Sequence, residues 1–176
     1  AAGYKDFTFS VKMRLGWDNK EEWRNILPIL NDTPLTRITL HPRLGREQYK
    51  QPADREEFAR FYEECRHPLV YNGDLTTLEE MNRTAEEFPR LEGLMIGRGL
   101  LGNPALGKEY KEQRNLSHGE KASMLADFHN KFYQAITPRL QGNTQILSKL
   151  KPYWEYLLPD MEKRDRKAII KASTAE

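Results

Sequence analysis

Apolar and polar positions follow two alternating rhythms over the first hundred residues. Residues 7–14 alternate with a period of two, which indicates a strand, whereas Phe58, Phe61, Tyr62 and Cys65 recur at the spacing of one helix face. The same reading, applied along the chain, predicts strands at 7–14, 37–43, 68–72 and 93–97, and helices at 21–30, 54–65 and 77–88. Strands that alternate with helices indicate an α/β fold with a parallel sheet.

Four strand-helix units of this size predict a (β/α) barrel of the TIM type, but only half of one, because a complete barrel takes about 250 residues. We expect Phe7, Phe9, Leu40 and Val70 to point into the barrel interior. Half a barrel leaves strand edges open. The chain is therefore expected to associate with a missing N-terminal half-barrel or with a second copy of itself.

Beyond Pro104 the pattern becomes helical only. Ser117 and Glu120 are spaced as a capping box, and apolar stripes follow within 124–136 and 146–157, with a shorter helix near 164–171. We therefore divide the chain into a half-barrel domain at 1–104 and a small all-α domain at 105–176.

Polar residues stand two apart at the ends of three predicted strands, so that each pair shares a face. These pairs are Lys12 with Arg14, His41 with Arg43, and Asn72 with Asp74. Chemistry in (β/α) barrels takes place at the C-terminal ends of the strands. Salt bridges at the rim explain any single pair, but the three pairs together favour a binding site.

Glycines follow the last two apolar runs. The backbone amides of Gly73, Gly97 and Gly99 are predicted to converge on a phosphate, helped by a helix N-terminus. Gly97, Gly99 and Gly102 also fit the dinucleotide fingerprint, which requires an acidic residue at the end of a second strand. Glu120 has about that spacing but lies in a helical region, so we reject this interpretation.

Charge is distributed unevenly although the formal net charge is only +2. Residues 1–104 hold 15 basic and 17 acidic side chains, and residues 105–176 hold 13 and 9. The last predicted helix places Lys163, Arg166, Lys167 and Lys171 on one face. A solvated helix face and a nucleic-acid contact both account for this pattern.

One cysteine in 176 residues excludes an internal disulfide and suits a reducing cytoplasm. Cys65 lies on the apolar face of its predicted helix, which favours a buried structural role over a nucleophilic one. The four histidines lack the spacing of metal ligands, and no stretch reaches the ~20 apolar residues of a membrane span. We therefore expect neither a metal nor a membrane partner.

Five motifs stand in order along the chain and together resemble the C-terminal half of the tRNA-dihydrouridine synthases. They are Lys12-Met-Arg-Leu-Gly16, His41-Pro-Arg43, Gln48-Tyr49 with Ala53-Asp54, Asn72-Gly-Asp74 and Met95-Ile-Gly-Arg-Gly99. The family consists of flavin-dependent barrel enzymes with a helical tRNA-binding domain, and it reduces the C5–C6 double bond of a uridine. The resemblance implies FMN as cofactor, NADPH as hydride source and tRNA as substrate.

The resemblance also implies roles for particular residues. FMN contacts are expected from Lys12, His41, Asn72, Gly73, Asp74, Gly97 and Arg98. Substrate or RNA contacts are expected from Arg14, Arg43, Tyr49, Arg166 and Lys167.

Three departures from the family pattern are visible. Leu44 stands where the family commonly has threonine, and Arg55 where it often has tryptophan. The proton-donating cysteine of the family belongs to an Asn-x-Gly-Cys-Pro loop in the first half-barrel, and this sequence has no such motif. We therefore expect no catalytic residue in this chain and no turnover by the chain alone. The alternatives are another FMN-dependent barrel oxidoreductase acting on a small pyrimidine, and a non-catalytic RNA-binding fragment.

Overall fold

A computed structural model describes residues 7–174 of the chain. The chain divides into two compact units, which we describe separately. The first unit contains residues 1–75 and 79–96, and the second contains 76–78 and 97–176. The assignment of 1–104 to an FMN barrel and of 105–176 to tRNA binding stays a prediction.

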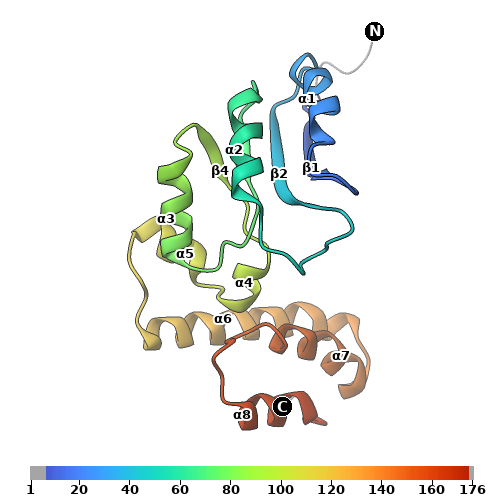
Figure 1. The fold of residues 1–176 in the computed structure, drawn as a ribbon. Coiled ribbons are helices and arrows are strands. Elements are labelled where there is room, and N and C mark those ends of the chain that lie inside the picture. The colour runs from blue at the N-terminus through green and yellow to red at the C-terminus, as the bar shows by residue number, and fades with distance from the viewer. Residues whose placement is uncertain (1–6, 175–176) are drawn as a thin grey trace. The chain divides into compact units, whose positions relative to one another are not determined.

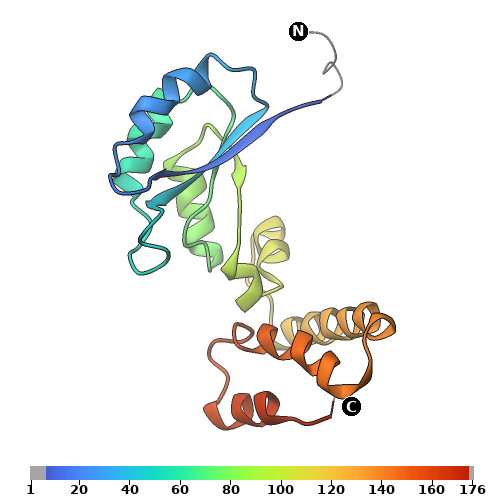
Figure 2. The same cartoon turned by 90° about the vertical axis from the view of Figure 1, so that its right-hand side faces the viewer.

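The first unit is built on a parallel sheet of four strands in the order β1-β2-β3-β4. The strands are β1 (Ser10–Gly16), β2 (Arg37–Leu44), β3 (Leu69–Tyr71) and β4 (Leu91–Leu94), and they alternate with the helices α1 (Trp23–Asn31), α2 (Arg55–Glu64) and α3 (Leu78–Glu87). Figures 1 and 2 show these three helices on one side of the sheet. The predicted α/β alternation is confirmed.

The register of the strands decides which side chains share a face. Lys12 pairs with Thr39 and Arg14 with His41, so these four residues lie on one face, which we call the polar face. Tyr71 points to the opposite face, where its ring meets Phe58 of α2 at 4.7 Å between centroids. This opposite face is the one that the helices cover.

One prediction about the faces is wrong. Leu40 pairs with Tyr71 and Val70 with Thr39, so Leu40 and Val70 point to opposite faces and do not line one interior. Phe7 and Phe9 precede β1, which begins at Ser10, and are 66% and 57% exposed. Leu40 is therefore the residue that departs from the prediction, because it faces the helices, whereas Val70 shares the polar face with Thr39.

Aromatic side chains fill the space between the sheet and its helices. Phe58 lies 4.9 Å from Phe88 between ring centroids, and Trp23 lies 5.2 Å from Phe61 in edge-to-face geometry. All four are almost fully buried. Burial of each such side chain contributes about 1.5–3 kcal/mol, so this packing holds the first unit together.

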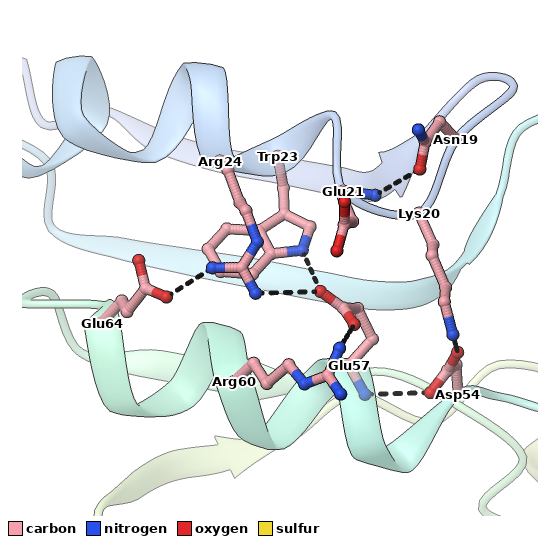
Figure 3. A network of polar contacts seen from close by, with 9 residues as sticks. All are labelled: Asn19, Lys20, Glu21, Trp23, Arg24, Asp54, Glu57, Arg60 and Glu64. Atoms are coloured by element: carbon pink, nitrogen blue, oxygen red, sulfur yellow. Dashed lines mark hydrogen bonds and ion pairs between the residues drawn. The ribbon is translucent and has the colours of Figure 1, made fainter.

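A buried carboxylate joins α1 to α2 (Figure 3). Glu57 is fully buried and accepts hydrogen bonds from Trp23 Nε1 at 2.9 Å and from Arg60 Nη1 at 2.8 Å. Arg24 lies 3.6 Å from the same carboxylate. Asp54 caps α2 by accepting from the Glu57 backbone N–H at 2.9 Å. A buried charge is tolerated where it is paired and hydrogen-bonded, as Glu57 is.

The second unit is helical throughout its described part. Its helices are α4 (Arg98–Gly102), α5 (Leu106–Glu112), α6 (His118–Ile136), α7 (Gly142–Trp154) and α8 (Lys163–Lys171), with a 3₁₀ turn at Thr137–Arg139. The predicted capping box of Ser117 and Glu120 is confirmed at the start of α6. Tyr153 packs on Phe132 at 4.6 Å between centroids and so joins α7 to α6. Within the described residues, no helix has the length and apolar character to cross a membrane.

Candidate functional site

The pairing of β1 with β2 positions the first candidate residues. Side chains in register on neighbouring parallel strands project from the same face, which brings Lys12, Arg14 and His41 together on the polar face. Lys12 is exposed, Arg14 is half-buried and His41 is buried. The sequence predicted this gathering of three polar side chains, and the structure places them as expected.

Arg43 ties three segments together from inside the fold. Its guanidinium is 3% exposed and donates from Nη1 to His41 Nε2 at 2.9 Å and from Nε to the Gln51 carbonyl at 2.6 Å. Nη2 makes a short ion pair with Asp74. Each guanidinium nitrogen therefore has a protein partner. Arg43 acts as a support for the site, and its predicted contact with substrate stays a prediction.

His41 is held neutral by this arrangement. Arginine has donors only, so the contact with Arg43 makes His41 Nε2 an acceptor and leaves the ring hydrogen on Nδ1. Burial, followed by the positive charges of Arg14, Arg43 and Lys12, lowers the pKa of His41 to about 4, although Asp74 opposes the shift. His41 thus offers a neutral N–H donor at ordinary pH.

The polar face carries more positive than negative charge around His41. Burial and then the neighbouring Arg14 guanidinium lower the pKa of the Lys12 ammonium. Crowded cations of this kind favour an anion, because a negative group would relieve their repulsion. The donors present here fit an anionic or electron-rich ring system.

Asn72, Gly73 and Asp74 organise the end of β3. The Asn72 side-chain amide donates to the Met95 carbonyl at 2.7 Å and thereby links the ends of β3 and β4. A Cβ on Gly73 would stand 2.8 Å from the Cβ of Ala53, so this close approach requires glycine. Asp74 adopts φ 42° and accepts from the Ala53 backbone N–H at 2.9 Å. Their FMN contacts stay predictions.

Gly97 and Arg98 lie at the start of α4, in the second unit. Both are exposed, and a Cβ on Gly97 would meet nothing within 4 Å. An uncovered glycine backbone suits close approach by a ligand. Their convergence with Gly73 on one phosphate stays a prediction.

Arg14 and Tyr49 border the polar face. Arg14 Nη1 donates to the Leu44 carbonyl at 2.7 Å, and its guanidinium lies 5.9 Å from the centre of the Tyr49 ring. The Arg43 guanidinium lies 5.6 Å from the same ring, which is 54% exposed. This is the arrangement of an aromatic surface backed by cations.

Arg166 and Lys167, both predicted to contact RNA, differ in their exposure and in their partners. The Arg166 guanidinium donates to the Trp154 and Leu158 carbonyls, each at 2.5 Å, and so fastens α8 to the segment that follows α7. Lys167 is exposed, as are Lys163 and Lys171 at spacings of four residues on the same side of α8. The RNA contacts of Arg166 and Lys167 stay predictions, and Lys167 has the exposure that such a contact needs.

Cys65 ends α2 and is buried, as the sequence predicted. Burial raises the pKa of its thiol, and its Sγ lies 3.7 Å from the His67 carbonyl. Because α2 runs antiparallel to the strands, Cys65 lies at the N-terminal edge of the sheet, away from the polar strand ends. In residues 7–174, no three histidine, cysteine, aspartate or glutamate side chains form a group that would hold a metal ion.

Sequence reasoning missed the loops that border the polar face. The Glu22 carboxylate accepts the backbone N–H groups of Trp17, Asp18 and Asn19 at 2.9, 3.0 and 2.6 Å. Nothing in the hydrophobic pattern signals this, because loop hydrogen bonds follow no periodicity. The one signal in the sequence was a tryptophan placed between Gly16 and Asp18, where a loop is expected.

Comparison with known proteins identifies the family. The chain matches the dihydrouridine synthase (Dus) family model over residues 4–168. It is 31% identical over 74% of its length to the tRNA-dihydrouridine(16) synthase of Aquipseudomonas alcaligenes, covering 43% of that protein. It is 35% identical over 60% of its length to the tRNA-dihydrouridine(16) synthase of Pseudomonas syringae pv. tomato, covering 33% of that protein.

A human relative gives the same result. The chain is 35% identical over 71% of its length to the human tRNA-dihydrouridine(47) synthase (NAD(P)(+))-like protein, of which it covers 20%. The chain thus spans less than half the length of these relatives. The four-stranded parallel sheet and the helical unit are consistent with part of a TIM barrel followed by a helical part. The match over residues 4–168 shows that the chain belongs to the dihydrouridine synthase family.

Proposed function

We propose that this chain is part of a tRNA-dihydrouridine synthase that reduces the C5–C6 double bond of a uridine in tRNA. The proposal includes FMN as the bound cofactor and NADPH as the source of hydride. Membership of the family supports the reaction class, and the residues of the polar face support the cofactor. The single observation that carries the proposal is the gathering of Lys12, Arg14 and a neutral His41 on one face.

The residues of the polar face fit the ring system of a flavin. When bound, FMN supplies hydride transfer to the substrate double bond. The Lys12 ammonium would place positive charge beside the flavin ring, and the His41 Nδ1–H would offer it a neutral donor. Arg43 holds His41 in that tautomer. The backbone amides at Gly73 and Gly97, with Arg98, are proposed to hold the phosphate.

The uridine is proposed to bind beside Arg14 and Tyr49. The ring of Tyr49 is 54% exposed and offers a stacking surface, while the Arg14 guanidinium contributes charge at its edge. Cys65 does not supply the proton, because it is buried, has a raised pKa and lies at the other edge of the sheet. We therefore propose that the acid comes from the missing half-barrel and that this chain alone has no turnover.

The second unit is proposed to bind tRNA through α8. Lys163, Lys167 and Lys171 present exposed ammonium groups on one side of that helix. Phosphate contacts of this kind are electrostatic and independent of sequence. Arg166 fastens the helix through its bonds to the Trp154 and Leu158 carbonyls. We place the activity in the cytoplasm, where the lone thiol stays reduced.

Dihydrouridine formation tests the proposal. The longer protein that contains this chain is incubated with unmodified tRNA and NADPH, and dihydrouridine is measured in the digested RNA by mass spectrometry. We expect product from that protein, far less from its Lys12→Ala variant, and none from the 176-residue chain alone. An FMN-loaded, NADPH-reducible protein that forms no dihydrouridine in any tRNA would contradict the assignment.

A further inference from the structure

Trp17 is the most exposed large aromatic side chain on the loops at the C-terminal ends of the strands. It follows β1 directly and is 66% exposed, whereas tryptophan is usually well buried. Trp23, six residues later, is fully buried in the core of the same unit. Trp17 thus contributes little to the core of the unit, and most of its side chain is available at the surface.

The loop that carries Trp17 is held firmly. The Glu22 carboxylate accepts three successive backbone N–H groups, from Trp17 to Asn19, and these bonds lower the pKa of Glu22. A Cβ on Gly16 would lie 2.3 Å from the Asn19 carbonyl, so the turn admits only glycine without rearrangement. The exposed indole is therefore displayed in a defined position.

The indole rests on the next loop. A Cβ on Gly45 would lie 2.4 Å from the Trp17 ring, which means that the ring packs directly against the Gly45 backbone. The Gly45 N–H donates to the Gly16 carbonyl at 2.8 Å, and the Arg46 N–H to the Trp17 carbonyl at 3.4 Å. The loops after β1 and β2 thus form one surface, and the rest of the indole is open to solvent.

The charges around Trp17 suit a nucleic acid. Arg46 is exposed and pairs with Asp18 at 3.0 Å, and Lys50 is exposed further along the same loop. The carboxylates of Glu22 and Glu47 are occupied by backbone N–H groups, with Glu47 accepting from Leu44 at 2.9 Å. The surface therefore shows an indole, the exposed Arg46–Asp18 pair and the Lys50 ammonium, and an exposed aromatic ring with basic side chains nearby is a feature of single-strand RNA platforms.

We propose that the Trp17 indole is a stacking platform for an unpaired base that neighbours the target uridine in the RNA. The inference rests on the proposed function, since it places a second nucleotide on the loops bordering the polar face. Aromatic and arginine residues also anchor protein partners. RNA is favoured here because the indole follows the strand that carries Lys12 and Arg14, and therefore lies at the edge of the face proposed to receive the target uridine.

Fluorescence of the 176-residue chain tests the platform. A single-stranded uridine hexanucleotide is the probe, and quenching of tryptophan emission reports contact with the indole. A Trp154→Phe background removes the half-buried tryptophan of the second unit, and the buried Trp23 serves as internal reference. Trp17→Phe should abolish the quenching with little loss of affinity. Loss of one base–aromatic stack costs about 1–3 kcal/mol, so Trp17→Leu should weaken binding by about 5- to 150-fold.

Two further variants separate stacking from general surface effects. Gly45→Ala keeps the indole but displaces it, because the new Cβ would overlap the ring, and its affinity should fall between wild type and Trp17→Leu. Ile29→Ala changes a residue of the same unit that is 67% exposed and has no aromatic face, and it should bind like wild type. Circular dichroism confirms that each variant remains folded.

The outcomes separate this inference from the proposed function. If unmodified tRNA binds the longer protein and is reduced, but Trp17→Leu in that protein and in the chain binds RNA as wild type does, the platform is overturned and the function stands. If the longer protein neither binds nor reduces tRNA, the proposed function itself fails.

Discussion

The two faces of the sheet in the first unit treat charge in opposite ways. On the helix-covered side, the buried Glu57 is met by Trp23 and Arg60, and its charge is balanced within the fold. On the polar face, Lys12 and Arg14 lie beside a neutral His41, and burial, followed by the neighbouring positive charges, lowers the pKa of both Lys12 and His41. The charges on the helix-covered side are thus balanced within the fold, whereas those on the polar face are the ones we propose for ligand binding.

The second unit repeats the comparison on a single helix. Arg166 is occupied by two backbone carbonyls, while Lys167, one residue later, is exposed. Identical charge in adjacent residues therefore serves packing in one case and is available for binding in the other. We therefore expect replacement of Arg166 to lower stability, and replacement of Lys167 to lower RNA affinity.

The largest effect is expected on the helix-covered face. Phe58→Ala removes a fully buried ring that contacts Tyr71 and Phe88, and it should lower the free energy of unfolding by about 3–5 kcal/mol. Urea denaturation, followed through the emission of Trp23, measures this. Phe9→Ala, at a ring that is 57% exposed, is the control and should change stability by less than about 0.5 kcal/mol. Equal losses in both variants would contradict the assignment of the hydrophobic core to the helix-covered face.

The next effect concerns α8. Replacing Lys163, Lys167 and Lys171 by glutamine should weaken tRNA binding, because fewer phosphates are then neutralised. The slope of log K against log salt should become shallower by about 0.7–0.9 for each phosphate that the variant no longer neutralises. Filter binding at several salt concentrations measures both quantities. Lys131 is the matched control, because it is exposed yet paired with Asp127 at 2.7 Å, and Lys131→Gln should have a smaller effect.

Arg166→Gln sharpens this experiment. It removes the two bonds that fasten α8, so it should destabilise the second unit more than any of the lysine replacements do. A triple lysine variant that binds tRNA with an unchanged salt slope would show that the exposed face of α8 is only solvated.

The smallest effect is a change of protonation at His41. Arg43→Gln removes a neighbouring positive charge, so the pKa of His41 should rise from about 4 toward its ordinary value. Nitrogen-15 NMR of the imidazoles, assigned with His41→Gln, reports both tautomer and pKa. Arg46→Gln, which alters an exposed guanidinium paired with Asp18, should leave His41 unchanged.

The same shift predicts a pH dependence of stability. The folded pKa of His41 lies below the unfolded value, so the unfolded chain takes up the proton more readily. The stabilising contribution of neutral His41 is present above about pH 6.5 and is lost as the pH falls toward 4. Wild type should therefore lose more stability than His41→Gln over this interval, and a parallel loss in both would contradict the account.

Elements with strong local signals were predictable from the sequence. The capping box at Ser117 and the helix after Asp54 follow from spacing, and the pairs at the strand ends follow from the period of two. The start of β1 was harder to predict. Phe7 and Phe9 continue the alternation of apolar and polar residues, but the strand begins at Ser10. Pairing partners decide where a strand begins, and the sequence of one strand does not contain them.

Tertiary contacts account for the remainder. In sequence Glu57 is an ordinary charged residue of an amphipathic helix, and its burial depends on the Trp23 indole together with the Arg60 and Arg24 guanidinium groups. Arg43 has the same alternation as His41, yet the positions of Asp74 and the Gln51 carbonyl turn it into a support. Residue type and spacing indicated the candidate residues. Contacts between segments distant in the sequence determine which of them are buried and which partners they have.

Binding of FMN to the polar face tests the central claim most directly. Flavin fluorescence is titrated with the longer protein, its Lys12→Ala variant and its Lys20→Ala variant, which alters an exposed lysine paired with Asp54 at 3.3 Å. Loss of one charged hydrogen bond costs about 1.5–3 kcal/mol, so Lys12→Ala should lower the affinity for FMN by roughly 10- to 150-fold. The free energy of unfolding should not change. Lys20→Ala should bind as wild type does. Wild-type FMN affinity and full reduction by NADPH in Lys12→Ala would contradict the claim that the polar face is the flavin site.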